Sequence, residues 1–384
     1  NNADTEIIKK VRLGLLDKEF FEKEIVPHPL MAETENSVVE GVHKYWNILS
    51  NLDEQTIPAE TPPFAVPRCP SSFLFVFGGQ DDLPDKPDIF VYDSRADLWK
   101  KVDIELPGAW SGMGSATHDN KIYLAGGRWR RPCDENTSYP RNIYRFDPDD
   151  MSFKKLSHMR QKRDCLCLVE LKDDIYALGG WNGGNIHSSV EVYKMARNQW
   201  YNVSPMNTPR WNFGAAVIDN KIYCVGGWTG PGEITNTAEV FNPDTAAWTM
   251  LPSMLKKRGN TRCVALRGFI VVVGGCYRVD RKLDSCEMFD PRTNAWQPFP
   301  SMNIERCSHS VTVVDGNILV IGGFISDGNT TEQVELFDWD RWSWVTVAPL
   351  PAGRGVMSSQ VVQTKGLSVE ARQRFRIKQK SCAL

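Results

Sequence analysis

The sequence lacks a long apolar run and an excess of charge of either sign. Its apolar runs, such as Phe269–Val273, end in glycine after five residues. A membrane-spanning helix needs 18 or more apolar residues, so we expect no membrane span. The formal net charge of -2 provides no overall basic field, and we therefore expect no binding of nucleic acid.

The sequence also lacks a pattern typical of a metal or disulfide site. Its ten cysteines include no CxxC pair, and its six histidines include no HExxH motif. Acidic residues are scattered through turns instead of being paired. We therefore expect no metal, no cofactor and no catalytic activity. The chain begins at Asn1 without a signal-like apolar segment. It is interpreted as a partial or processed chain from a reducing, cytoplasmic compartment.

What the sequence does contain is a repeat. Six apolar, strand-like runs each end in a glycine doublet. The doublets are Gly78-Gly79, Gly126-Gly127, Gly179-Gly180, Gly226-Gly227, Gly274-Gly275 and Gly322-Gly323. Successive doublets lie 48, 53, 47, 48 and 48 residues apart. A period of this length indicates a repeat architecture.

Two further marks recur in each copy. Downstream of each doublet, two aromatic residues stand seven residues apart, at Tyr92/Trp99, Phe146/Phe153, Tyr193/Trp200, Phe241/Trp248, Phe289/Trp296 and Phe337/Trp344. An arginine follows in five copies, at Arg163, Arg210, Arg258, Arg306 and Arg354, and Trp110 takes its place in the other. Strand-like residues and a turn come next, so each period predicts four strands.

This pattern predicts an all-β six-bladed propeller over residues 71–363. A four-stranded unit cannot bury both of its faces alone, whereas six units around an axis bury them against one another. The strand at 71–77 follows a proline-rich linker, 58–70, and so has no inner neighbour before it. We expect residues 356–362 to supply that strand and to close the ring.

The flanking segments differ from the repeat. In residues 1–57 apolar side chains recur at three and four residue spacing, which predicts a short α-helical segment. Residues 364–384 contain six Lys/Arg and one Glu. They predict a basic, disordered tail, and weak electrostatic contact with an acidic partner or with lipid head groups is the alternative.

The glycine doublet, the aromatic pair and the period of about 48 residues resemble the kelch repeat. Residues 11–31 are similar to the C-terminal half of a BACK domain, which in kelch-like proteins lies between a BTB domain and the propeller; the alternative for this segment is a generic amphipathic helical hairpin. The resemblance implies a substrate-recognition adaptor of a cullin-3 ubiquitin ligase, with cullin-3 bound through a BTB/BACK part that this chain lacks. An actin-binding, cytoskeleton-associated kelch protein is the alternative.

The resemblance also implies where a partner binds. Loops after the doublets and after the repeated arginine emerge on one face of the propeller, and loops on rigid scaffolds carry recognition. The candidate partner-binding residues are Arg128, Trp129, Arg130, Trp181, Asn182, Trp211, Asn212, Trp228, Tyr277 and Phe324. Trp, Tyr and Arg are enriched at binding hot spots. Ordinary exposed loop residues are the alternative for the aromatic positions.

The second copy has a longer loop, residues 128–141, that is rich in arginine. It favours an acidic or phosphorylated target protein or peptide. The repeated arginines Arg163, Arg210, Arg258 and Arg306 have two equal interpretations. They either contact a partner or brace adjacent blades through backbone carbonyls.

Overall fold

The computed structural model describes residues 72–80, 87–104, 106–130 and 138–375, together with Lys23 and Val26. The chain divides into two units, Asn1–Cys69 with Lys378–Leu384 and Pro70–Ile377, and every described strand belongs to the second unit. The predicted helical segment, apart from those two residues, and the predicted linker lie outside the described residues. So do residues 376–384 of the predicted tail.

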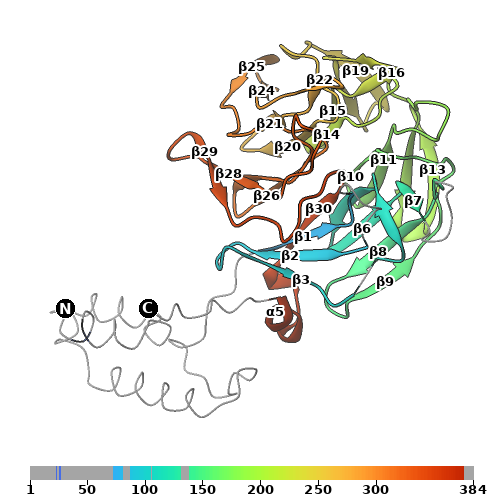
Figure 1. The fold of residues 1–384 in the computed structure, drawn as a ribbon. Coiled ribbons are helices and arrows are strands. Elements are labelled where there is room, and N and C mark those ends of the chain that lie inside the picture. Colours follow the sequence, from blue (N-terminus) through green and yellow to red (C-terminus); the bar gives the residue numbers. More distant parts are fainter. Residues whose placement is uncertain are drawn as a thin grey trace, which may run out of the picture. The chain divides into compact units, whose positions relative to one another are not determined.

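Six four-stranded antiparallel sheets form the blades of a propeller in the described chain (Figure 1). Blade 1 contains β30 (Ser358–Gln363), β1 (Ser72–Phe77), β2 (Ile89–Asp93) and β3 (Leu98–Lys101). Blade 2 contains β5 (Gly114–His118), β6 (Lys121–Ala125), β8 (Ile143–Asp147) and β9 (Ser152–Lys155). Blade 3 contains β10 (Cys167–Leu171), β11 (Asp174–Leu178), β12 (Val190–Lys194) and β13 (Gln199–Val203), with a 3-10 turn η3 (Met195–Arg197) between the last two.

The remaining blades repeat this arrangement. Blade 4 contains β14 (Gly214–Ile218), β15 (Lys221–Val225), β18 (Ala238–Asn242) and β19 (Ala247–Leu251). Blade 5 contains β20 (Arg262–Leu266), β21 (Phe269–Val273), β24 (Cys286–Asp290) and β25 (Ala295–Phe299). Blade 6 contains β26 (Ser310–Val314), β27 (Asn317–Ile321), β28 (Val334–Asp338) and β29 (Ser343–Val347). The predicted six-bladed propeller is confirmed.

The first and last strands of the propeller close the ring. β30 pairs antiparallel with β1, with Ser72 opposite Gln363 and Phe77 opposite Ser358. The inner strands β30, β5, β10, β14, β20 and β26 neighbour one another around the axis. The closing strand begins at Ser358, slightly later than the range 356–362 expected from the sequence.

The aromatic residues seven positions apart face each other across the outer hairpin of each blade. Tyr193 lies directly opposite Trp200, and their ring centroids are 5.3 Å apart. The six pairs have centroid distances between 4.8 and 5.3 Å. The Trp200 indole also donates to the carbonyl of Ser157 in the preceding blade, at 2.8 Å. Trp99, Trp248, Trp296 and Trp344 make the equivalent bond. Each tryptophan therefore seals the space between two blades.

The repeated arginines join neighbouring blades. Arg210 is fully buried, and its Nη1 donates to the carbonyls of Gly226 at 2.8 Å and Thr237 at 3.0 Å. Its Nε donates to Glu239 at 3.0 Å. Its own carbonyl accepts from the Gly180 N–H of the preceding blade at 2.8 Å. Each such arginine therefore ties two blades together.

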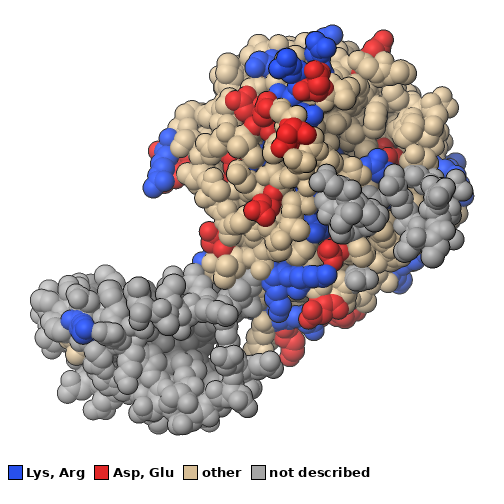
Figure 2. Space-filling view, viewed as in Figure 1, with Lys and Arg blue, Asp and Glu red and all other residues tan. Residues whose placement is uncertain are grey.

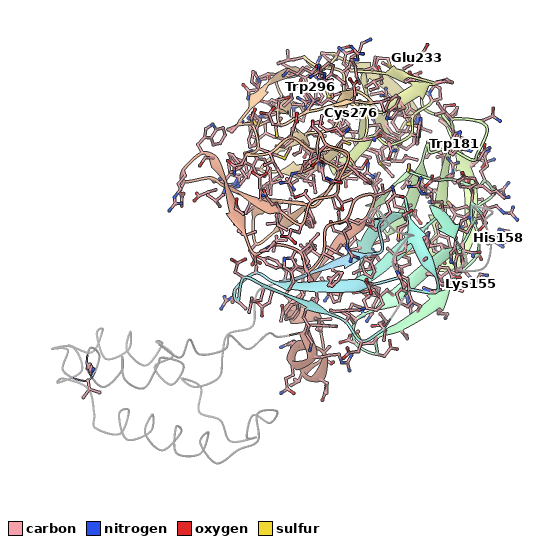
Figure 3. All side chains as sticks on the ribbon, in the orientation of Figure 1. Lys155, His158, Trp181, Glu233, Cys276 and Trp296 are labelled. Carbon is pink, nitrogen blue, oxygen red and sulfur yellow. The ribbon has the colours of Figure 1, made fainter. Side chains whose placement is uncertain are left out.

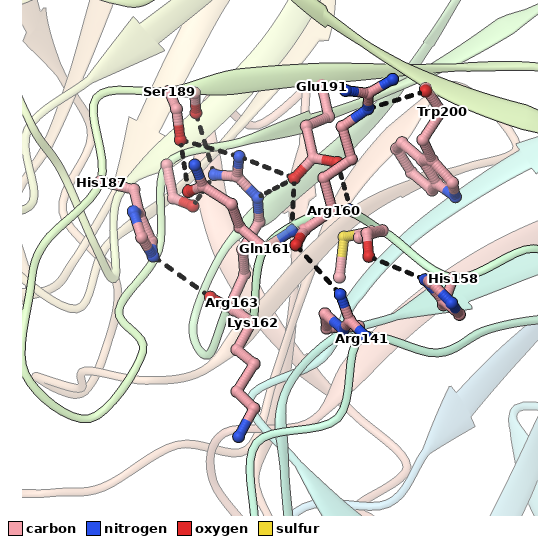
Figure 4. Close-up of polar contacts among 12 residues, drawn as sticks. Arg141, His158, Arg160, Gln161, Lys162, Arg163, His187, Ser189, Glu191 and Trp200 are labelled. Atoms are coloured by element: carbon pink, nitrogen blue, oxygen red, sulfur yellow. Dashed lines mark hydrogen bonds and ion pairs between the residues drawn. The ribbon is translucent and has the colours of Figure 1, made fainter.

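Equivalent bonds recur at Arg163, Arg258 and Arg306, and Figure 4 shows them around Arg163. At Arg306 the Nη2 atom, in place of Nε, donates to the glutamate, Glu335, at 2.6 Å. Burial lowers the pKa of Arg163 and of Arg306, and the paired glutamates oppose that shift. Because all four side chains are fully buried, the bracing interpretation is correct and a partner contact is excluded.

A glycine is required at the doublets because the arginine loop packs directly on them. Gly226 has φ of +64°, and a Cβ there would lie 2.5 Å from the carbonyl oxygen of Arg258. Gly227 has φ of +95°, and its Cβ would lie 2.6 Å from the Phe213 side chain. The left-handed backbone and the close approach both exclude a larger residue.

Residues 364–375, which the sequence predicts to be disordered, form ordered structure instead. A 3-10 turn, η4 (Thr364–Gly366), leads into helix α5 (Val369–Phe375). The Phe375 ring lies 4.9 Å from Phe75, and both side chains are buried. Ala371 and Phe375 stand four residues apart on one face of the helix and cover the core of blade 1. The many charged residues around them make this apolar face hard to recognise in the sequence. No helix among the described residues is long and apolar enough to cross a membrane.

Candidate protein-binding face

Short antiparallel pairings surround one end of the propeller axis. In each, the residue that follows a glycine doublet pairs with the residue that follows the arginine, or Trp110, at the junction leading into the same blade. Trp228 and Trp211 exchange two backbone hydrogen bonds, of 3.0 and 3.2 Å, and Phe324 and Cys307 do the same at 2.8 and 3.0 Å. In blade 2 the pairing lengthens into strands β4 (Ala109–Ser111) and β7 (Arg128–Arg130). We call these paired loops the rim face.

A narrow ring of backbone lies directly below the rim face. It is built from six residues in the left-handed conformation, with φ between 49° and 65°, namely Gly112, Cys165, Asn212, Asn260, Ser308 and Val356. The N–H of Asn212 donates to the carbonyl of Cys165 at 3.0 Å, and that of Cys165 to Gly112 at 2.8 Å. Because Asn212 belongs to this ring and is buried, it offers a partner little surface.

Below this ring the inner strands enclose a channel cavity of about 340 Å³. Polar side chains in its wall bond to the protein itself. Gln360 Nε2 donates to Ser115 Oγ at 3.0 Å, and Arg262 Nη1 donates to the carbonyl of Thr261 at 3.0 Å. These groups stabilise the channel wall.

Four aromatic side chains form a continuous arc on the rim face. The centroid distances are 5.5 Å from Tyr139 to Trp181, 5.8 Å from Trp181 to Trp211 and 6.2 Å from Trp211 to Trp228. Trp228 is buried and donates from Nε1 to Asn260 Oδ1 at 2.7 Å. Trp181 and Trp211 are partly exposed (Figure 3 labels Trp181). We call these four residues the aromatic arc.

Arg128 is held beside the arc in a fixed geometry. Its Nε donates to Ser111 Oγ at 3.0 Å, and its Nη2 donates to Gln80 Oε1 at 2.6 Å. Its Nη1 lies 3.8 Å from the Asp164 carboxylate, and its side chain is 24% exposed. The Asp164 backbone pairs with that of Trp181, so Arg128 and the arc belong to one surface.

Two other predicted residues shape the rim by contacts within the protein. Asn182 Oδ1 accepts from the backbone N–H groups of Gly184 at 3.0 Å and Asn185 at 2.8 Å, and so fixes a turn. Trp129 stacks on Trp110 with a centroid distance of 6.3 Å. Neither arrangement is visible in the repeat pattern.

The last three predicted residues differ in accessibility. Phe324 is partly buried and lies over Gly355, where a Cβ would come within 2.4 Å of its ring. Tyr277 is 46% exposed. The Arg130 backbone pairs with Ala109, and its side chain lies outside the described part of the chain.

The structure adds one aromatic residue that the repeat pattern does not predict. Tyr139 lies near the end of the longer loop of the second copy, residues 128–141, where no repeat mark stands, and it packs edge-on against Trp181. The Ser-Tyr-Pro sequence near the end of that loop was the only available signal.

One group of potential metal ligands lies at the opposite end of the inner strands. His118 Nδ1 is 3.7 Å from the Glu170 carboxylate and 3.9 Å from that of Asp173. It is the only such group found in the described residues. The sequence did not indicate it, because the turns that carry it are more than fifty residues apart. Because these side chains are partly or well exposed, an ordinary surface contact between polar groups also explains their proximity.

The KLHDC2/KLHL20/DRC7 Kelch-repeats domain model matches residues 53–227, 133–323 and 212–369. The chain belongs to this kelch-repeat family. A solved structure entitled "Structure of YjhT" shares the kelch propeller fold with a TM-score of 0.60. It is 14% identical, and the match covers 73% of this chain and 99% of that one.

Curated relatives match parts of this kelch chain. Kelch repeat and BTB domain-containing protein 2 of Cowpox virus (strain Brighton Red) is 29% identical over 143 residues, 37% of this chain and 25% of the relative. Kelch-like protein 36 of Mus musculus is 28% identical over 203 residues, 52% and 32% of the two chains. Kelch-like protein 33 of Homo sapiens is 26% identical over 197 residues, which are 47% of this chain and 36% of the relative. The chain thus matches only about a quarter to a third of these relatives' length.

Proposed function

We propose that this kelch propeller is the target-recognition part of an adaptor for a cullin-3 ubiquitin ligase. It binds a target protein through the rim face, and the associated ligase transfers ubiquitin, so the propeller itself is not an enzyme. The observation that carries the proposal is the aromatic arc with Arg128 beside it. Trp and Arg dominate binding hot spots, and side chains already held in place lose little entropy on binding.

The ligase side of the proposal rests on family architecture. The cowpox virus relative carries a BTB domain in its name, and residues 11–31 resemble part of a BACK domain. In this proposal cullin-3 binds a BTB and BACK part of the natural protein, and the rim face stays free for the target. Such an adaptor acts in the cytoplasm. An actin-binding role, suited to acidic actin, is the competing outcome of the test.

The test is affinity purification of the full-length natural protein, followed by mass spectrometry. Arg128→Ala/Trp211→Ala removes the cation and one ring of the arc. Arg341→Ala/Trp342→Ala is the matched control, because it removes the same residue types from an exposed turn of blade 6. Thermal melting of each variant verifies folding.

We expect cullin-3 with all three proteins and a set of partners lost only from the rim variant. Recovery of actin without cullin-3 would replace the adaptor with a cytoskeletal role. If neither cullin-3 nor actin is recovered, both the adaptor role and the cytoskeletal role are overturned. Partners retained by the rim variant would show that recognition takes place elsewhere.

A further inference from the structure

Exposed apolar side chains gather on the blade 5 side of the rim face. Seven large apolar residues are exposed in the described chain, at Leu98, Met250, Leu255, Tyr277, Val279, Trp342 and Val369. Three of them, Leu255 at 59%, Tyr277 at 46% and Val279 at 72%, lie in the two rim loops of blade 5. Exposed apolar residues that cluster together indicate an interaction site. We call residues 255–257 and 277–282 the blade 5 patch.

The same two loops also carry cations. The patch contains five, Lys256, Lys257, Arg278, Arg281 and Lys282, and one carboxylate, Asp280. The side chains of Arg278 and Arg281 are 70% and 66% exposed. Their distances to Asp280, 3.5 and 3.9 Å, are those of weak surface pairs, so most of the positive charge faces solvent. Figure 2 shows Lys and Arg side chains around the place where Figure 1 labels β22, with Asp and Glu side chains among and beside them.

The backbone of the patch is fixed by the blade below it. Strands β22 (Cys276–Arg278) and β23 (Arg281–Lys282) form a projecting hairpin. Cys276 exchanges backbone hydrogen bonds of 2.7 and 2.8 Å with Gly259, which places the two loops side by side. The N–H groups of Leu255 and Lys256 donate to Glu287 at 2.6 and 3.0 Å. A surface held in this way loses little entropy when a partner binds.

We propose that the blade 5 patch is the docking surface for an acidic segment of the target protein that also carries a large apolar side chain. This inference rests on the proposed function, since it names the segment that the rim face recognises. The cations attract the acidic residues and set the rate and orientation of docking. The three apolar residues bury the apolar side chain, which distinguishes a peptide from a polyanion such as DNA.

Random 16-residue peptides displayed on phage and selected against the whole 384-residue chain test the inference. Enriched peptides are synthesised, and their affinities are measured by fluorescence anisotropy. Tyr277→Ala and Arg278→Glu/Arg281→Glu alter the patch. The matched control, Arg292→Glu/Arg341→Glu, reverses two equally exposed charges in the outer turns of blades 5 and 6.

We expect peptides that combine Asp or Glu with a large apolar residue. Their dissociation constants should rise about tenfold or more in both patch variants and about twofold or less in the control. Affinity should also fall as salt rises from roughly 0.05 to 0.3 M, because the contact is electrostatic in part.

Several results would overturn the inference. Enrichment of peptides without acidic residues would overturn it. Peptides that no longer bind Arg128→Ala/Trp211→Ala but still bind the patch variants would also overturn it. The second result leaves the proposed function intact and moves recognition to the aromatic arc. If no peptide is enriched, or if duplex DNA or phosphatidylserine vesicles bind as tightly as any peptide, the inference fails. Recovery of cullin-3 still decides the proposed function separately.

Discussion

The Trp110 indole donates to the carbonyl oxygen of Gly126 at 2.6 Å, the same doublet-carbonyl bond that an arginine Nη1 makes at the five other junctions between blades. The carbonyl of Trp110 also accepts from Gly79, as an arginine carbonyl does elsewhere. Tyr144 stands where four other blades have a glutamate, and its ring lies 5.6 Å from that of Trp110. A neutral aromatic pair therefore replaces a buried ion pair at this junction.

This replacement predicts how the arginine and glutamate of another blade depend on each other. Arg210→Trp alone should lower the free energy of unfolding by about 3 to 5 kcal/mol, because Glu239 stays buried without its cation. Arg210→Trp/Glu239→Tyr should recover part of that loss, since it copies the Trp110 and Tyr144 pair. Urea denaturation of the single and double variants measures the recovery.

Glu239→Tyr alone completes the cycle, and exposed Arg197→Ala, which should change stability little, is the control. The loss in the double variant is compared with the sum of the losses in the two single variants. If the double variant loses as much free energy of unfolding as that sum, the two pairs are not interchangeable.

His309 predicts a loss of stability in mild acid. It is fully buried, and burial together with Arg306 and Arg262 holds its pKa well below the usual value. The unfolded chain therefore binds a proton that the folded chain excludes once the pH falls below about 6.5. Stability should decrease there by up to about 1.4 kcal/mol per pH unit.

His309→Met should reduce this pH dependence, because a methionine side chain does not titrate. Met113 and Met357 occupy the equivalent position in two other copies, so methionine suits this site. Melting temperatures between pH 8 and pH 5 measure the pH dependence, and identical profiles for the variant and the wild type would assign the acid sensitivity to other groups.

Ala246 predicts a simple stabilising change. It is exposed and has φ of +52°, a conformation that glycine adopts without strain. Ala246→Gly should raise the free energy of unfolding by about 0.5 to 1 kcal/mol. Ala247→Gly, one residue later in strand β19, should lower it by a similar amount. Denaturation curves that move in the same direction for both would contradict the backbone argument.

Helix α5 should contribute to the stability of blade 1 through one residue. Phe375→Ala removes a buried ring from between Phe73 and Phe75 and should cost about 3 to 5 kcal/mol. Val369→Ala on the same helix changes a side chain that is 61% exposed and should cost little. Thermal melting distinguishes them, and equal melting temperatures would show that the helix adds nothing to the fold.

The repeat could be predicted from sequence because each mark reports a local rule. Seven residues separate Tyr193 from Trp200 because a hairpin places them opposite each other. The glycine doublets mark a left-handed turn that other residues cannot adopt without strain. The role of Arg210 stayed open, because its partners Gly226 and Glu239 lie in the next repeat and sequence gives no burial.

The candidate site was less predictable, because rim residues carry no repeat mark. Trp228 and Trp211 look alike in sequence, yet one is buried and the other partly exposed. Leu255 and Val279 belong to loops that are separate in sequence, and the backbone pairing of Gly259 with Cys276 brings these loops side by side. Phe375 was missed because a basic sequence surrounds one apolar face of a short helix.

The pairing of β1 with β30 has a consequence for how the protein is made. Blades 2 to 6 are each built from one continuous stretch of chain, so each can form as soon as its own residues leave the ribosome. Blade 1 cannot form in this way, because β1, which begins at Ser72, pairs with β30, which ends at Gln363 and is synthesised last among the described strands. Until then β1 presents an apolar edge open to other chains, which makes the interval before β30 emerges the step at which a chaperone would be needed most.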